Sequence, residues 1–170
     1  MSGGLSQRLE RVARDHVPIA ITIFLAVFST APFYIPGYGM VAANLALMGV
    51  FYWSVHRPDL LSPVAAFCIG LLYDFLAGTP PGMTALIFVV VRGLTGAQGG
   101  SLAGKPFLFL WLGFWGAAAG AGVTAWIISA VWHAALLDPA PLLFQVGLTI
   151  ALFPFVSWLL VWIQHKLLPV

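Results

Sequence analysis

The stretch that decides the fold is GLLYDFLAGTPPG, residues 70–82, an apolar run that contains one acidic residue, Asp74. Only 7% of the chain is charged, so a carboxylate inside such a run requires an explanation. Gly70, Asp74 and Gly78 are spaced by four, which places them on one face of a helix. Glycines on that face let a second backbone come close, so we predict that Asp74 is held between helices.

The composition excludes a soluble domain with a charged surface. Of the 170 residues, 61% are hydrophobic, and the mean hydropathy is +1.01. The apolar core of a bilayer is about 30 Å thick and takes about 20 residues per helical span. The chain has room for six such spans, which predicts an all-α integral membrane protein built as one six-helix transmembrane bundle.

Six apolar segments separated by turn residues define the predicted transmembrane domain, residues 17–166. Their ranges are 17–35, 40–56, 60–77, 80–98, 106–134 and 142–165. The first segment follows three arginines as a secretory signal would, but Pro32 disfavours cleavage after Ala31, so we interpret the segment as a helix. Residues 1–16 form a basic cytoplasmic segment, either an amphipathic helix on the anionic leaflet or a frayed tail.

Turn chemistry locates the reversal between the third and fourth segments. Gly78 suits a helix C-terminal cap, Thr79 an N-cap and Pro80 the first residue of the next helix. Two spans can therefore reverse direction over very few residues. In the last segment, Pro154 predicts a kink, because the carbonyl four residues earlier loses its partner.

The basic residues predict the orientation. With six spans and the N-terminus inside, the three outer turns contain no Lys or Arg. Arg92 then lies nearer the cytoplasmic side than the outer side. The residues that fall on the cytoplasmic side are Arg8, Arg11, Arg14, Arg57, Lys105 and Lys166. Both termini are therefore predicted to be cytoplasmic.

Three polar residues are predicted to share one layer, roughly 6 Å below the outer boundary of the bilayer: Asn44, Asp74 and Thr84. A polar side chain at this depth is costly unless it faces the bundle interior and finds partners. Asp74 could accept hydrogen bonds from the start of the fourth helix or from Asn44, or it could bind a ligand or a proton. We favour the structural role, because no second acid or base accompanies it.

Arg92 lies about twelve residues into the fourth segment. Its side chain could snorkel toward the cytoplasmic side or reach back toward Asp74. We favour snorkelling.

Gly113, Gly116 and Gly120 form a small-residue stripe on the fifth segment. Such stripes allow helices to pack backbone to backbone. We favour packing within the chain, with a face for another protein's membrane helix as the alternative. Trp111, Trp115 and Trp126 are candidates for contact with such a partner.

Signatures of enzyme chemistry are sparse. The sequence contains no hydrolase or zinc-protease motif, no pair of intramembrane aspartates and no phosphate-binding loop with a lysine. Cys68 is the single cysteine and is interpreted as a packing residue, and no two histidines are spaced by four. We expect no enzymatic activity, no cofactor, no metal site and no nucleic-acid partner.

The run Gly70-x3-Asp74-x3-Gly78-x3-Gly82-x2-Ala85-Leu86 resembles the core signature of the MreD family of rod shape-determining proteins. Upstream, Asn44, the pair Tyr52 and Trp53, and Pro58 stand where that family tends to have Asn, Tyr-Trp and Pro. The match is specific over residues 44–90 and only compositional beyond them. The sequence departs from the family at Ala43, where a proline is frequent, and at GAQGG (96–100), where a basic cluster is frequent.

The resemblance implies a multi-pass protein of the bacterial inner membrane that acts as a non-enzymatic scaffold in cell elongation. It implies binding to the bitopic protein MreC. It also implies a connection, directly or through MreC, from the actin-like filament of MreB to the glycosyltransferase RodA and its transpeptidase partner.

The family is similar at fold level to the S-components of energy-coupling-factor transporters, which are six-helix bundles that bind vitamins in an outward-facing pocket. This likeness supplies the alternative, a substrate-binding subunit of a small-molecule transporter. Such a subunit needs a lid over its pocket, and the predicted outer turns are only about four residues long.

Overall fold

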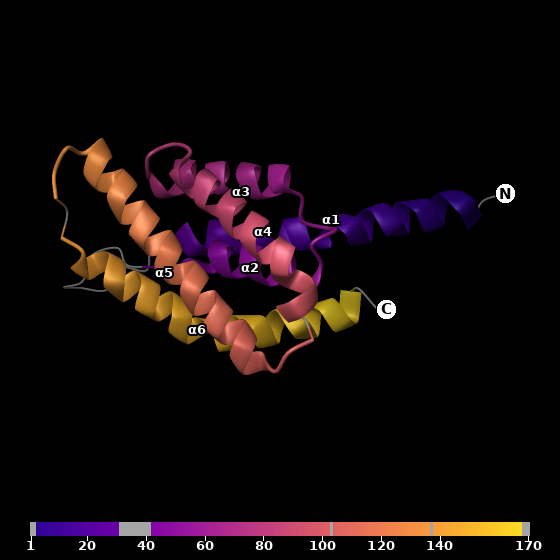
Figure 1. Ribbon diagram of the computed structural model, residues 1–170. Helices are drawn as coiled ribbons and strands as arrows, with labels where there is room; N and C mark the ends of the chain where they lie inside the picture. Colours follow the sequence, from indigo (N-terminus) through magenta and orange to yellow (C-terminus); the bar gives the residue numbers. More distant parts are fainter. Residues whose placement is uncertain (1–2, 31–41, 103, 137, 168–170) are drawn as a thin grey trace.

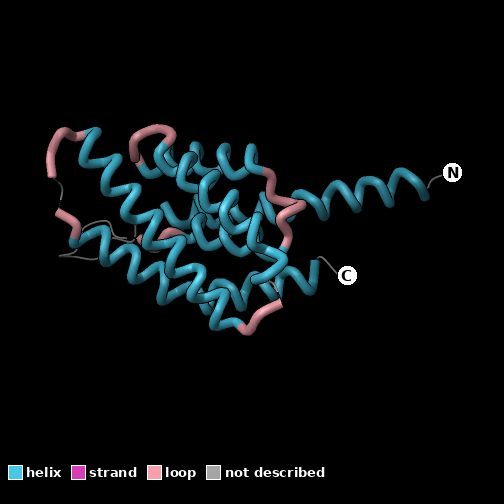
Figure 2. The backbone as a smooth tube through the Cα atoms, in the orientation of Figure 1, coloured by secondary structure: helices cyan, strands magenta, loops and turns pink. Residues whose placement is uncertain are grey.

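The computed structural model describes the backbone of residues 3–30, 42–102, 104–136 and 138–167, and it places no strand among them (Figure 1). Helices joined by short connections make up nearly all of this part of the chain (Figure 2). They are α1 (Gly3–Thr30), α2 (Leu45–His56), α3 (Pro63–Ala77), α4 (Met83–Leu102), α5 (Phe107–Trp132) and α6 (Ala140–Leu167). The predicted all-α class is confirmed. The end of the predicted segment 17–35 and the start of 40–56 lie outside the described residues.

α1 is one continuous helix across residues 16 and 17, where the sequence analysis placed the boundary between the basic segment 1–16 and the first span. Its N-terminal half projects beyond the other helices (Figure 1). Pro18 lies inside α1, and the Thr22 hydroxyl donates a hydrogen bond to the Pro18 carbonyl at 2.7 Å. A single proline removes one backbone donor but keeps a helical φ, so it does not by itself end a helix.

α2 forms the centre of the bundle and contacts all five other helices. Only its end residues, Leu45 and His56, are not buried. The Phe51 ring meets Phe114 of α5 and Phe153 of α6 edge-on, with centroid distances of 5.2 and 5.8 Å. Phe114 and Phe153 stack on each other at 4.0 Å. With twelve residues α2 is only about 18 Å long, and its neighbours cover it.

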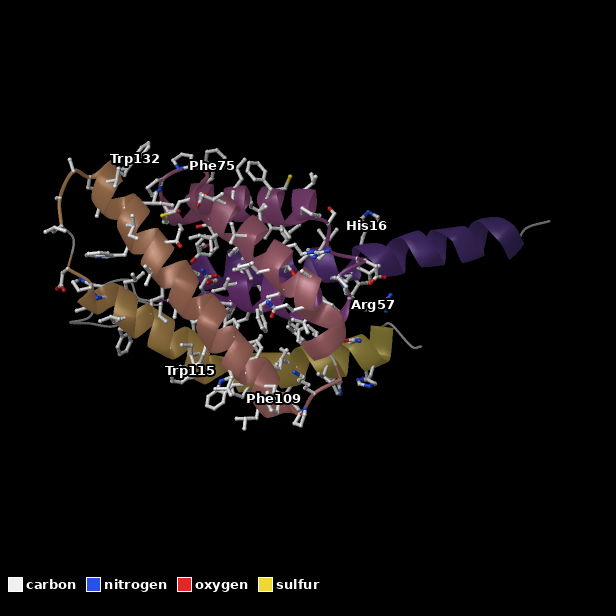
Figure 3. The ribbon with its side chains drawn as sticks, in the orientation of Figure 1. His16, Arg57, Phe75, Phe109, Trp115 and Trp132 are labelled. Carbon is white, nitrogen blue, oxygen red and sulfur yellow. The ribbon has the colours of Figure 1, made fainter. Side chains whose placement is uncertain are left out.

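Two helices in the described part of the chain, α5 and α6, are long and apolar enough to cross a membrane. The apolar stretches of α1, α2, α3 and α4 are shorter. Large apolar side chains are exposed along the outside of the bundle, among them Phe75, Trp115 and Trp132 (Figure 3). Such an exposed apolar surface marks an interaction with a membrane or with other proteins.

α6 continues through Pro154 without a break. Proline has no N–H, so the carbonyl of Ile150 lacks its usual helical donor. The indole N–H of Trp111 on α5 donates to this carbonyl at 3.2 Å. Trp111 therefore joins α5 to α6, a role inside the chain that the sequence did not predict for it.

Both ends of the described chain lie at the same end of the bundle, and Arg57 and His16 are at that end as well (Figure 3). The α2–α3 and α4–α5 connections are also located there, whereas the α3–α4 and α5–α6 connections lie at the opposite end (Figure 1). We call these the terminal end and the far end.

Candidate functional site

Asp74, near the last turn of α3, is the centre of a hydrogen-bond cluster at the far end. Its side chain is 1% exposed. The carboxylate accepts hydrogen bonds from the Thr79 hydroxyl at 2.7 Å and from the backbone N–H of Gly82 at 2.9 Å. It also accepts from the N–H of Thr84 at 3.0 Å and of Ala85 at 3.4 Å. Asp74 thus satisfies the free donors at the start of α4, where the helix dipole also favours a negative group.

The glycines around Asp74 have distinct backbone roles. Gly78 ends α3 in the left-handed conformation with φ of 69°, as predicted, and Gly82 has φ of 91° before α4 begins. A Cβ on Gly70 would lie 2.5 Å from the Cα of Ala85, so only glycine lets α3 and α4 approach this closely. The spacing that drew attention to Asp74 therefore reflects one tightly closed helical hairpin.

The prediction for the start of α4 was wrong. The helix begins at Met83, so Thr79 is not its N-cap and Pro80 is not its first residue. The Thr79 hydroxyl is bound to Asp74, and the cap of α4 is supplied by that carboxylate from another helix. Thr84 is accordingly in the first turn of α4, where its backbone N–H contributes to the cluster.

Asn44 was predicted to lie within the segment 40–56, but it is the N-cap of α2. Its side-chain oxygen accepts from the N–H of Leu47 at 2.9 Å. Its backbone N–H donates to the Thr149 hydroxyl of α6 at 3.0 Å. None of the hydrogen bonds found in the described residues joins Asn44 to Asp74, so the predicted polar layer consists of two adjacent clusters.

Gln145 and Thr149 of α6 were missed by the sequence analysis. The Gln145 amide donates to the carbonyl of Ala42 at 3.0 Å, and the Thr149 hydroxyl donates to the carbonyl of Gln145 at 2.7 Å. Two polar side chains spaced by four in the apolar first half of α6 were the available signal. They join the start of α2 to α6.

Arg92 is bound to the α2–α3 connection, toward the terminal end. Its guanidinium donates to the carbonyls of Leu61 and Pro58, each at 2.5 Å. A Cβ on Gly96 would collide with the guanidinium, so glycine provides its space. Of the two directions left open for the Arg92 side chain, the one toward Asp74 is not adopted in this structure.

Tyr52 and Trp53 are buried in α2, and Pro58 follows in the α2–α3 connection. The Tyr52 hydroxyl donates to the Gln164 side-chain oxygen of α6 at 2.8 Å. Its ring stacks on His56 with a centroid distance of 4.2 Å. Tyr52 therefore anchors α2 to α6.

Gly113, Gly116 and Gly120 line an open groove between α4 and α5 with a volume of about 330 Å³, here called the α4–α5 groove. A Cβ on Gly116 or Gly120 would meet nothing within 4 Å. The favoured expectation, close packing within the chain, is therefore wrong for Gly116 and Gly120. α5 packs inward with a different face, which consists of Leu110, Phe114, Ala118 and Gly122.

The three tryptophans considered for partner contact lie in different surroundings. Trp115 is exposed and points away from the bundle (Figure 3). Trp111 is bound to α6 through Ile150. Trp126 lines a second cavity at the far end. Only Trp115 has the exposure that contact with a partner requires.

Within the described residues, no three His, Cys, Asp or Glu side chains come together in an arrangement that could hold a metal. Comparison with protein-family models, curated proteins and solved structures found no match to this chain.

Proposed function

We propose that this chain is a multi-pass scaffold of the bacterial inner membrane, without enzymatic activity, that acts in the rod complex of cell elongation. In this proposal it binds MreC and links the MreB filament to RodA and its transpeptidase partner. The resemblance over residues 44–90 supports the family. The α4–α5 groove is the structural observation on which partner binding depends.

The membrane topology in this proposal has six spans with both termini in the cytoplasm. It is supported by the two long apolar helices, α5 and α6, and by the apolar side chains exposed around the bundle. Arg57 and both chain ends lie at the terminal end (Figure 3). A cytoplasmic terminal end agrees with the excess of basic residues in cytoplasmic loops.

The α4–α5 groove has the chemistry of a site for a membrane helix. Its α5 wall consists of small residues around Gly116 and Gly120, and its α4 wall carries aliphatic residues such as Leu86, Val90 and Leu94. No charged side chain lines it among the described residues. Helices associate in lipid through close packing at small residues, so an apolar helix is the occupant that fits. A bitopic protein such as MreC brings one such helix.

Filling the groove tests the proposal. A Cβ at position 120 meets nothing within 4 Å, and Gly120→Leu replaces a poor helix former, so the fold is expected to remain intact. We expect recovery of MreC with the tagged chain from cells to fall by about tenfold, which corresponds to about 1.4 kcal/mol. Rod shape in a strain that depends on this chain should be lost in parallel.

The matched control is Ala119→Leu on the same helix. Ala119 is exposed and does not line the groove. It should leave both readouts unchanged. Normal MreC recovery with Gly120→Leu would contradict the assignment of the groove, and substrate turnover by the purified wild-type chain would contradict the scaffold role.

A further inference from the structure

A second cavity of about 500 Å³ opens at the far end between α2, α3, α4, α5 and α6, and we call it the end pocket. Its volume is within the range of about 300–1,000 Å³ that is usual for small-molecule sites. Ile87 and Ala121 form the wall between it and the α4–α5 groove. The scaffold role proposed above makes no use of this cavity.

Polar groups of fixed geometry lie on the side of the end pocket formed by α2 and α6. The side-chain oxygen of Asn44 is occupied by capping α2, and the side-chain nitrogen of Gln145 by the carbonyl of Ala42. The hydrogen bonds found among the described residues leave the Asn44 amide N–H groups and the Gln145 amide oxygen available. The pocket therefore offers at least one donor and one acceptor on side chains that are already positioned.

The interior of the end pocket is apolar and has aromatic residues on two sides. Tyr73 of α3 and Trp126 of α5 line it together with aliphatic side chains such as Leu47 and Val146. Small residues of α5, among them Ala125, leave the space that the cavity occupies. An apolar cavity with a few convergent polar groups is the usual form of a site that binds an amphipathic ligand.

The charge of the lining selects among ligands. Asp138 is the one charged residue among the described residues of the lining, and its carboxylate accepts from the N–H of Ala140 at 3.0 Å. The described residues of the lining include neither Lys nor Arg. An anionic ligand would meet like charge and no compensating cation, whereas a neutral or cationic one would not.

We propose that the end pocket binds a small amphipathic molecule that is uncharged or cationic. Its apolar body would lie between Tyr73 and Trp126, and its polar group would bond to the amides of Asn44 and Gln145.

The test uses two dyes that share one aromatic framework and differ in charge: neutral N-phenylnaphthylamine and anionic anilinonaphthalene sulfonate. The full chain is placed in phosphatidylcholine nanodiscs, and dye fluorescence is corrected with empty nanodiscs. We expect saturable binding of the neutral dye and binding of the sulfonate weaker by at least about tenfold. Asp138→Asn, which keeps an acceptor oxygen for Ala140, should strengthen sulfonate binding several-fold and leave the neutral dye unchanged.

Tryptophan substitutions place the dye in the pocket. Ala125→Trp on the α5 wall and Leu142→Trp on the α6 wall should each weaken binding of the neutral dye by about tenfold or more. The matched control is Val123→Trp, because Val123 is exposed on the outer side of α5 and lines neither cavity. Circular dichroism shows whether each variant is folded. Because the two pocket variants lie on separate helices, the test still holds if one of them does not fold.

Three results would overturn the proposal. The first is the absence of saturable binding of the neutral dye, which is also the result if bulk lipid already fills the pocket. The second is equal affinity for the two dyes. The third is undiminished binding of the neutral dye by a folded pocket variant.

Discussion

α4 meets α3 and α5 in opposite ways, although both present small residues to it. Toward α3 the backbones are so close that a Cβ on Gly70 would be 2.5 Å from Ala85. Toward α5 the space beside Gly116 and Gly120 is empty. Small residues therefore permit a close approach but do not produce one.

The difference between the two pairs lies in what holds them together. The α3–α4 pair has the buried Asp74 carboxylate, which binds donors from the turn and from the start of α4. Between α5 and α4 the described residues show a weaker polar contact, from the Ser129 hydroxyl to the Met83 sulfur at 3.6 Å. A charged acceptor bonded to several donors is stronger than such a contact, so the first pair is closed and the second can admit a partner.

The largest expected effect comes from Asp74→Leu. The substitution leaves the N–H groups of Gly82, Thr84 and Ala85 without their acceptor inside the fold. Each buried unpaired donor costs about 1–3 kcal/mol, so we expect a loss of at least about 3 kcal/mol in the free energy of unfolding. Unfolding by sodium dodecyl sulfate in micelles, followed by circular dichroism, measures it.

Asp74→Asn serves as the control for shape, since it retains one acceptor oxygen. It should lose only about 1–2 kcal/mol. If the leucine variant unfolded at the same detergent fraction as the wild type, the carboxylate could not be what closes α3 on α4.

A pair of identical substitutions tests the comparison directly. Gly70→Ala should destabilise the chain by about 1–3 kcal/mol, because the new Cβ forces α3 and α4 apart. Gly116→Ala meets open space and should be neutral or stabilising by up to about 1 kcal/mol, because alanine is the better helix former. Both are measured by the same unfolding assay.

Equal losses at Gly70 and Gly116 would show that the α4–α5 groove closes in the folded protein. Tolerance of alanine at Gly70 would instead show that the hairpin can separate without penalty.

The α3–α4 hairpin was the region most accessible from sequence. The αL cap at Gly78 and the location of Asp74 between helices follow from local rules and spacing. The start of α4 was mispredicted because capping rules consider residues close in sequence, whereas the cap comes from Asp74 in the preceding helix. The same limit applies to Asn44, which stands at a helix start that apolar flanking residues conceal.

The open stripe on α5 could not be identified from sequence. Gly113, Gly116 and Gly120 have the spacing of a close helix contact, and that spacing is identical whether the contacting helix belongs to this chain or to another. The direction of Arg92 was also undetermined, because its long side chain reaches either way along a helix. In both cases the outcome depends on which helices are neighbours, and this is a tertiary property.

The smallest expected effect concerns the contact between α5 and α6, which is closed by a polar group as α3–α4 is. Trp111→Phe removes the donor to the Ile150 carbonyl and should cost about 1 kcal/mol in the unfolding assay. Trp115→Phe, on the exposed side of the same helix, should cost nothing measurable.

The loss at Trp111 has a specific cause, which is the amide hydrogen that Pro154 lacks. In a Pro154→Ala background the helix supplies that donor itself, so Trp111→Phe should become nearly neutral, and the two substitutions should couple by about 1 kcal/mol. An equal loss in both backgrounds would mean that the indole contributes by packing alone.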